Sequence, residues 1–244
     1  MIFSEKELAT LSKLNLPVKP VALGLFLKKP EGIDRLDEKM QCCKMFKRAR
    51  EGYPFYTDIE NHACDAALYA LGMKDLPPAY EGREVGAALR LFKEPRVARR
   101  LYFYMPKLQK NTINYIAFST LDRLTFRPDV LLFGSDTNQA EILLRAIHYS
   151  TGQMWSSKFT PVLGCAWTIV YPYVTGEVNY VIPGFEGGMK EFQVFPDGFV
   201  LTSIPFEIVP SLLQNLEEMP LVLPTFKPDG QEFRKQIRTE LGLD

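Results

Sequence analysis

Apolar and polar positions follow a helical period in some stretches of the chain and a strand-like pattern in others. Helical spacing predicts helices over 4–14, 37–51, 61–72, 136–150 and 205–218, with two more between 82 and 104 that meet at Pro95. Apolar runs between turn residues predict strands over 21–27, 114–120, 130–133, 177–182, 189–195 and 199–204. Strands that alternate with helices and then cluster near the end indicate an α/β (α+β mixed) fold, a mixed sheet with helices packed on it.

Several residues mark the ends of these helices. Ser4 followed by Glu7 is a capping box, in which each side chain bonds the backbone N–H of the other residue. Asn61 is expected to cap the helix that ends at Gly72, and Gly52 is expected to end the preceding helix in a left-handed conformation.

The helix over 136–150 has the most regular pattern. Glu141 and Arg145 are four residues apart and can pair on a different face of the helix from its apolar residues. A single apolar stripe is expected to face the core, because its residues recur at three- and four-residue spacing. The stripe consists of Ala140, Leu143, Leu144 and Ile147.

Length and composition indicate an ordinary folded chain. It has 244 residues, of which 46% are hydrophobic and 24% charged. We expect a single α/β domain over 1–244, with a core of about 8–219 and a proline-rich tail over 220–244. Lys and Arg balance Asp and Glu at 29 each, so the overall charge gives no strong signal for nucleic-acid binding.

The sequence also predicts a compartment. Residues 1–14 are charged and amphipathic, unlike an export signal, and no apolar run approaches the roughly 18 residues of a membrane span. Four cysteines are too few for a disulfide scaffold. We therefore expect a soluble cytoplasmic protein with reduced thiols and no membrane association.

Most sequence signatures of catalysis are missing. The chain has no G-x-G-x-x-G after a strand, no Walker A sequence, no G-x-S-x-G, no H-E-x-x-H and no C-x-x-C. It has two histidines, His62 and His148, so one chain cannot form a three-histidine metal site. The catalytic residues, if the protein is an enzyme, are not identified by any motif.

Two basic runs are candidates for phosphate or carboxylate binding. The first is 44–50, and the second contains Arg96, Arg99 and Arg100 beside the aromatic run 102–104. Basic and aromatic side chains together can suit single-stranded nucleic acid. Without a recognisable nucleic-acid fold, solvated helix faces and core packing of the aromatic rings are the favoured explanations.

A glycine-rich segment over 183–188 is a candidate anion site. Backbone N–H groups of such a segment can bind an anionic small molecule. A turn between two strands also accounts for the glycines, and composition favours that explanation. The residues assigned to this candidate site are Gly184, Gly187, Gly188 and Arg50.

Three separated cysteines form the other candidate site. Cys43 lies on the helix before Gly52, Cys64 follows the expected cap Asn61, and Cys165 comes a hundred residues later. A helix start lowers the pKa of a thiol, so we expect Cys64 to favour the thiolate. With His62 or an open position as the fourth ligand, these side chains could bind zinc or an iron–sulfur cluster. Each cysteine could instead be a small buried hydrophobe.

The chain resembles a prokaryotic family, the domain-of-unknown-function family 169. Four short pieces in the same order carry the resemblance, over about 8–219. They are Pro20-Val21-Ala22, then Cys43 with Ala49-Arg50-Glu51-Gly52, then His62-Ala63-Cys64 with Leu71-Gly72, and last Gly164-Cys165 with the glycine-rich segment and Ser203-Ile204-Pro205.

The resemblance implies no reaction, but it implies that Cys43, Cys64 and Cys165 belong to one site. This chain departs from the family pattern in Asp65-Ala66-Ala67 after the second cysteine and in a glycine-rich segment without cysteine or arginine. Three classes of function remain open. They are a cysteine-ligated metal or iron–sulfur protein, a module that binds an anionic small molecule, and an interaction protein whose cysteines are core residues.

Overall fold

A seven-stranded sheet forms the centre of the computed structural model, which describes residues 2–79, 84–183 and 187–243. Its strand order is β2-β3-β4-β1-β5-β7-β6. Only the β2–β3 pair is parallel, so the sheet is mixed. The strands are β1 (Val21–Phe26), β2 (Asp34–Arg35), β3 (Phe55–Thr57), β4 (Tyr115–Thr120), β5 (Val130–Ser135), β6 (Asn179–Val181) and β7 (Val200–Pro205).

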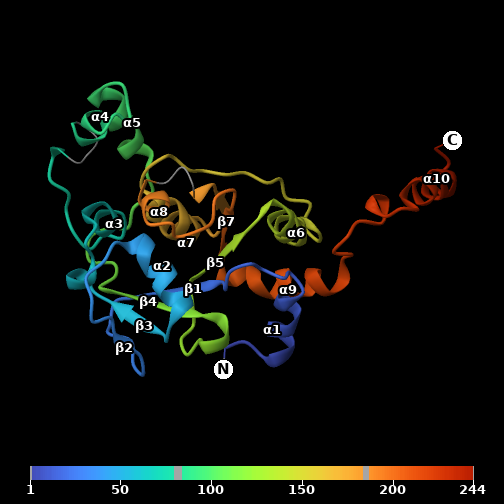
Figure 1. Ribbon diagram of the computed structural model, residues 1–244, viewed down its shortest axis with the longest axis horizontal. Helices are drawn as coiled ribbons and strands as arrows, with labels where there is room; N and C mark the ends of the chain where they lie inside the picture. Colours follow the sequence, from blue (N-terminus) through green and yellow to red (C-terminus); the bar gives the residue numbers. More distant parts are fainter. Residues whose placement is uncertain (1, 80–83, 184–186, 244) are drawn as a thin grey trace.

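Helices are inserted between the strands along the chain (Figure 1). The α-helices are α1 (Glu5–Ser12), α2 (Cys42–Glu51), α3 (Asp65–Ala70), α4 (Val85–Ala88), α5 (Pro95–Tyr104), α6 (Thr137–His148), α7 (Tyr171–Thr175), α8 (Gly187–Glu191), α9 (Val209–Glu218) and α10 (Gly230–Glu240). Short 3-10 turns are η1 (Ile59–Asn61), η3 (Leu121–Arg123), η6 (Phe206–Ile208) and η7 (Pro224–Phe226), and η4 (Ala166–Val170) is a π-helix. The α/β class is therefore confirmed.

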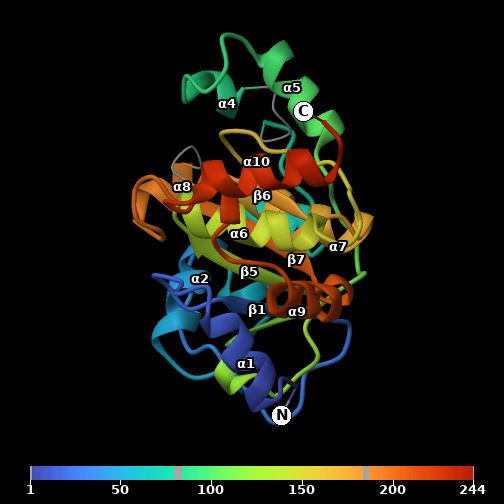
Figure 2. The ribbon, with the colours of Figure 1, turned by 90° about the vertical axis from the view of Figure 1, so that its right-hand side faces the viewer.

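The two faces of the sheet are covered by different helices. Successive strand residues point to opposite faces, so Val21 of β1 packs in one core cluster and Ala22 in the other. The first cluster lies under α2, α3, η4 and α8. The second lies under α1, α6 and α9, and α1 and α9 lie side by side (Figures 1 and 2). All three separated cysteines pack against the first cluster.

Local sequence signals predict the helices correctly where the pattern of capping and apolar residues is regular. The Ser4–Glu7 capping box is present, with Glu7 Oε2 accepting from the Ser4 backbone N–H at 2.7 Å. In α6 Leu143 and Ile147 of the predicted stripe pack in the second cluster, and Ala140 and Leu144 are buried. Arg145 Nε donates to Glu141 Oε1 at 2.9 Å. Asp136 caps this helix through the backbone N–H groups of its first turn.

The prediction of a strand over 189–195 is wrong. Residues from Gly187 form α8, and Met189 and Phe192 turn the same way toward the core. The three-residue spacing of these two side chains fits a helix, whereas the short apolar run that contains them also fits a strand. The sequence pattern of so short a segment therefore does not distinguish a helix from a strand. The sheet therefore ends with only β6 and β7 in this part of the chain.

Two helix boundaries also differ from the sequence prediction. Gly52 has φ −140°, an extended conformation that leads directly toward β3, so it is not a left-handed stop. A Cβ at this glycine would lie 2.7 Å from Arg48 Nη1, the end of a flexible and partly exposed side chain that can move aside, so this contact does not require glycine. Asn61 does not cap α3 but closes η1, and its side chain donates to the Leu36 and Glu38 carbonyls.

Two parts project from the body. The α4–α5 segment rises at one corner, and α10 extends from the opposite end (Figures 1 and 2). The prediction that the aromatic run 102–104 packs in the core is wrong for two of its rings, since Phe103 is 83% exposed and Tyr104 65% exposed. Only one side of α5, which carries Ala98 and Leu101, faces inward. Among the described residues, no helix is long and apolar enough to cross a membrane.

Candidate thiol site

Three elements from distant parts of the sequence supply the three cysteines. Cys43 is in the first turn of α2, Cys64 is the N-cap residue of α3, and Cys165 precedes η4. α2 packs on β4, and α3 contacts η4, so the sheet and the helix contacts bring these positions to one side of the molecule. All four cysteines of the chain are free, and none forms a disulfide.

The three thiols lie close enough to act on one another electrostatically. Burial raises the pKa of Cys43 to about 12, with smaller contributions from charge on Cys165 and Cys64. Burial raises the pKa of Cys64 to about 11, with a smaller contribution from charge on Cys165. These effects, together with the packing of all three side chains on the first core cluster, indicate that Cys43, Cys64 and Cys165 lie in one region, which we call the thiol pocket.

The expectation of a thiolate at Cys64 is wrong for the metal-free protein. Backbone N–H groups of Ala66 and Ala67 favour the thiolate, as a helix start should. Burial outweighs them, and α3 has only six residues, so its dipole is short. Both Cys43 and Cys64 are therefore neutral thiols near pH 7 until a cation or another electrophile lowers their pKa.

The backbone on either side of Cys165 is unusual. Leu163 has φ +66°, a left-handed conformation that a leucine rarely adopts, although its side chain is buried. The π-helix η4 begins directly after Cys165. Left-handed non-glycine residues and π-helical turns both concentrate at functional sites, where surrounding packing holds them in place.

Gly188 lets the backbone of α8 approach Cys43 closely. A Cβ at position 188 would lie 3.1 Å from Cys43 Sγ, closer than ordinary side-chain contacts. The structure therefore places Gly188 at the thiol pocket. Gly187 begins the same five-residue helix, and Gly184 lies outside the described residues.

Arg50, the other residue assigned to an anion site, is tied to the segment after α8. Its Nη2 donates to the Val194 carbonyl, and its guanidinium stacks on the Phe195 ring with 4.5 Å from Cζ to the ring centroid. Its Nη1 is buried without a hydrogen-bond partner, and burial lowers the pKa of the group. Arg50 thus holds α2 against the segment that follows α8, and its Nη1 remains available as a hydrogen-bond donor.

His62 is buried and turned toward the sheet. Its Nε2 lies 3.1 Å from Thr57 Oγ1 of β3, and its Nδ1 is buried without a partner. Burial lowers the pKa of His62 to about 4, which Asp58 partly offsets. Cys42 points into the core, where it is 1% exposed among Met45 and other residues of α2.

No preformed site for one metal ion is present in the described ranges. There, no group of three or more His, Cys, Asp or Glu side chains could hold an ion. A zinc ion with bonds of about 2.3 Å to tetrahedral thiolates would bring their sulfur atoms within about 4 Å of one another. The three thiols are therefore neighbours without the tight arrangement of a zinc site.

Sequence reasoning missed the features that distinguish this pocket. Gly164 follows Leu163 in the sequence, but no sequence pattern predicts the left-handed conformation of Leu163 itself or the π-helix η4. The contact between Gly188 and Cys43 joins residues 145 positions apart in the sequence. The sequence grouped the three cysteines as one alternative, and the resemblance to a family favoured that alternative.

Comparisons with known proteins agree with that resemblance. An uncharacterized protein of Methanocaldococcus jannaschii is 27% identical over 216 residues, which cover 87% of this chain and 91% of that protein. No solved structure matches the chain. The model of the DUF169 family, described as uncharacterised ArCR, matches residues 11–215, and the chain therefore belongs to the DUF169 family.

Proposed function

We propose that this protein is an iron–sulfur protein in which Cys43, Cys64 and Cys165 hold the cluster. The observation that carries the proposal is that three thiols from three separate elements pack against the same core cluster, with electrostatic effects of Cys165 and Cys64 on Cys43 and of Cys165 on Cys64. Unrelated buried cysteines in separate parts of a core would not act on one another. Cysteine thiolates are the usual ligands of iron–sulfur clusters.

A cluster suits this pocket better than a single zinc ion. Iron atoms bridged by sulfide hold their cysteine ligands farther apart than one zinc ion does. The thiols are neighbours, yet in the described part of the chain no group is arranged to hold one ion. Neighbouring cysteines that are not arranged around one ion fit a polynuclear cofactor better.

The surroundings of the pocket support the same proposal. Gly188 lets the backbone of α8 lie directly against Cys43 Sγ. The left-handed Leu163 and η4 fix the backbone on both sides of Cys165. The half-buried position of the thiols would shield a cluster from water.

Three protein ligands leave one coordination position for something else. An open position admits an exogenous ligand, and a cluster can also accept or donate an electron, so the proposed role is redox chemistry or small-molecule binding at the cluster. His62 is the other candidate for the fourth position. Its Nδ1 has no partner, whereas its Nε2 already bonds Thr57.

The test is anaerobic purification followed by iron, sulfide and zinc analysis and visible absorption. The proposal predicts brown protein with iron and sulfide in equal amounts. Cys43→Ala, Cys64→Ala and Cys165→Ala should each lose most of the iron, whereas Cys42→Ala, on the same helix as Cys43, should keep it. Colourless protein without iron after anaerobic reconstitution, or equal losses in all four variants, would contradict it. If elemental analysis finds zinc bound by the same three cysteines, the site is a zinc site and not a cluster site.

A second candidate function is binding of an anionic small molecule between α2 and α8. The observation that favours it is the buried Nη1 of Arg50, which has no partner within the described residues. Inorganic phosphate should then raise the melting temperature of the wild-type protein and not that of Arg50→Gln. Lys47→Gln, a change of an exposed cation on the same helix, is the matched control and should keep the response.

A further inference from the structure

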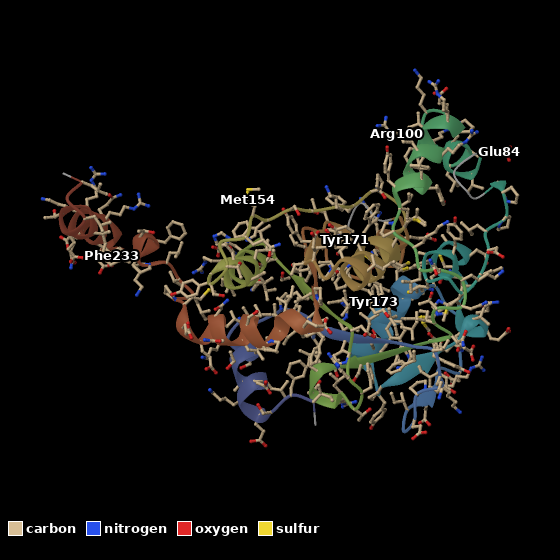
Figure 3. The ribbon with its side chains drawn as sticks, turned by 180° about the vertical axis from the view of Figure 1, so that it is seen from behind. Glu84, Arg100, Met154, Tyr171, Tyr173 and Phe233 are labelled. Atoms are coloured by element: carbon tan, nitrogen blue, oxygen red, sulfur yellow. The ribbon has the colours of Figure 1, made fainter. Side chains whose placement is uncertain are left out.

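The projecting α4–α5 segment is basic, although the whole chain is neutral. Between residues 84 and 107 the sequence carries six cations and two anions. The cations are Arg90, Lys93, Arg96, Arg99, Arg100 and Lys107, and the anions are Glu84 and Glu94. Figure 3 shows Arg100 and Glu84 on this projection, apart from the rest of the molecule.

The outer face of α5 combines arginines with an aromatic ring. Arg96, Arg99, Arg100 and Phe103 follow at intervals of three, one and three residues, which places them on one stripe of the helix. Phe103 is 83% exposed, and Tyr104 beside it is 65% exposed. The two rings meet edge to face, with 5.3 Å between centroids. We call Arg96, Arg99, Arg100, Phe103 and Tyr104 the outer face of α5.

Most of the charge on this face is not neutralised by the protein. Arg96 Nη2 pairs with Glu94 Oε1 at 3.2 Å, and both side chains are largely exposed. In the residues that the structure describes, no carboxylate lies within ion-pair distance of Arg99 or Arg100. Two exposed guanidinium groups one residue apart are well suited to neighbouring phosphates, which they can bind bidentately.

We propose that the outer face of α5 binds single-stranded nucleic acid. The arginines contact the backbone phosphates, and unstacked bases lie on the Phe103 and Tyr104 rings. Binding of this kind needs cations along the strand and aromatic platforms beside them, and it needs no base-specific contact. The proposal does not depend on the thiol pocket, and variants of the three cysteines that fold should keep the binding.

The arrangement of residues argues against a membrane surface as the partner. A helix that lies in a membrane interface separates an apolar face from a cationic face. On α5 the apolar face, with Ala98 and Leu101, is already packed on the protein. Phe103 instead stands among the arginines on the outer side. An acidic peptide could use the arginines, but it offers no flat rings for the two exposed aromatic side chains.

The test uses the full chain and a fluorescent oligouridine of about 20 nucleotides. Anisotropy gives the dissociation constant over a salt series that starts near about 50 mM. The variants are Arg99→Gln/Arg100→Gln and Phe103→Ala. The matched control is Arg234→Gln/Lys235→Gln, which removes two exposed cations from α10. Every substituted side chain is exposed, and circular dichroism checks that each variant is folded.

We expect the α5 arginine variant to bind at least about tenfold more weakly, with a salt slope smaller by about 1.4, because two phosphate contacts are lost. Phe103→Ala should weaken binding at least about fivefold at constant salt, the lower end of the effect of losing one stacked base. The α10 variant should bind like the wild type.

Several results would overturn the proposal. One is that oligouridine does not bind even at the lowest salt concentration, and another is that the α10 variant weakens binding as much as the α5 arginine variant does. A third is that Phe103→Ala keeps the affinity of the wild type, which would mean that only the charges contribute to binding. Vesicles of phosphatidylserine and phosphatidylcholine provide the last comparison. Binding to these vesicles but not to oligouridine, lost in the α5 arginine variant, would identify a membrane surface instead.

Discussion

Gly188 lies directly against Cys43, so close that a Cβ on the glycine would stand 3.1 Å from the sulfur. The two residues belong to α8 and α2, which pack together over the first core cluster. Lys44, the next residue of α2, also meets this segment, with its Nζ 4.3 Å from the centre of the Phe192 ring. The backbone and side chains of α8 and the residue after it therefore form one wall around the Cys43 thiol.

Gly188→Ala should reduce cluster binding more than it reduces stability. The added methyl group takes up space beside Cys43 Sγ, where a bound iron atom needs to approach. We expect a clear loss of iron after anaerobic reconstitution, with a melting temperature close to that of the wild type. Lys190→Ala, which changes an exposed residue of the same helix, should keep full iron content. Full iron content in Gly188→Ala would mean that the cluster does not reach this side of Cys43.

In the metal-free protein Cys43 and Cys64 should react slowly with iodoacetamide at neutral pH. The thiolate is the reactive form, and the pKa values of about 12 and 11 leave very little of it. The reaction should accelerate as the pH rises toward those values, and Cys43 should be the slower of the two. Mass spectrometry of alkylated peptides follows each site separately. Rapid alkylation of Cys64 at pH 7 would mean that the start of α3 stabilises the thiolate of Cys64, as the sequence predicts.

The same pKa shifts give a direction for stability in alkali. In the unfolded chain these thiols ionise around 9.0, whereas in the folded metal-free protein they stay neutral to about 11 and 12. The unfolded state therefore loses protons first as the pH rises, and the free energy of unfolding should fall above about pH 9. Urea titrations at pH 8 and pH 10 compare the two conditions. Cys43→Ala should show a smaller fall than the wild type, and an equal fall would contradict the assignment.

Regular patterns in the sequence were sufficient for much of the fold. α6 and the Ser4 cap of α1 depend on neighbours three or four residues away, and both match the prediction. The predictions failed where tertiary contacts determine the secondary structure. Met189 and Phe192 fit a helix or a strand, and packing over the core selects α8.

The site was predictable only in part, for related reasons. The helix start at Cys64 was visible in the sequence, but the burial that reverses its effect on the pKa comes from the rest of the fold. The exposure of Phe103 was also missed, because aromatic residues normally face a core. Its three-residue spacing from Arg100 nevertheless places it on the arginine stripe of the helix. The projection of α5 from the body leaves only one of its sides covered.

Leu143→Ala should destabilise the protein by about 2 to 5 kcal/mol, as large-to-small changes in a packed core do. Leu143 is fully buried between α6 and the sheet, so the cavity cannot fill with water at low cost. Urea unfolding monitored by circular dichroism measures the change. Asn138→Ala, at an exposed position of the same helix, should stay within about 0.5 kcal/mol of the wild type. A similarly small effect for Leu143→Ala would show that the stripe of α6 is not part of the core.

Protonation of His62 should limit stability in acid. In the unfolded chain this histidine takes up a proton around pH 6.5, whereas burial holds its pKa at about 4 in the folded protein. Between these two values the unfolded state binds the additional proton, so the free energy of unfolding falls as the pH falls. The full difference corresponds to about 3 kcal/mol, since each pKa unit is worth about 1.4 kcal/mol. Urea unfolding of the metal-free protein at pH 7, 6 and 5 follows this loss.

His62→Gln separates the titration of this residue from other acid effects. Glutamine keeps a hydrogen-bonding side chain near Thr57 Oγ1 but does not titrate, so the variant should be less stable at pH 7 and lose less stability on acidification. His148→Gln changes the other histidine of the chain and should leave the acid loss in place. If His62→Gln has the same dependence on pH as the wild type, the buried imidazole is already solvated or protonated in the folded state. In that case His62 would also be accessible to a ligand, and its unpartnered Nδ1 would become the first candidate for the fourth position at the cluster.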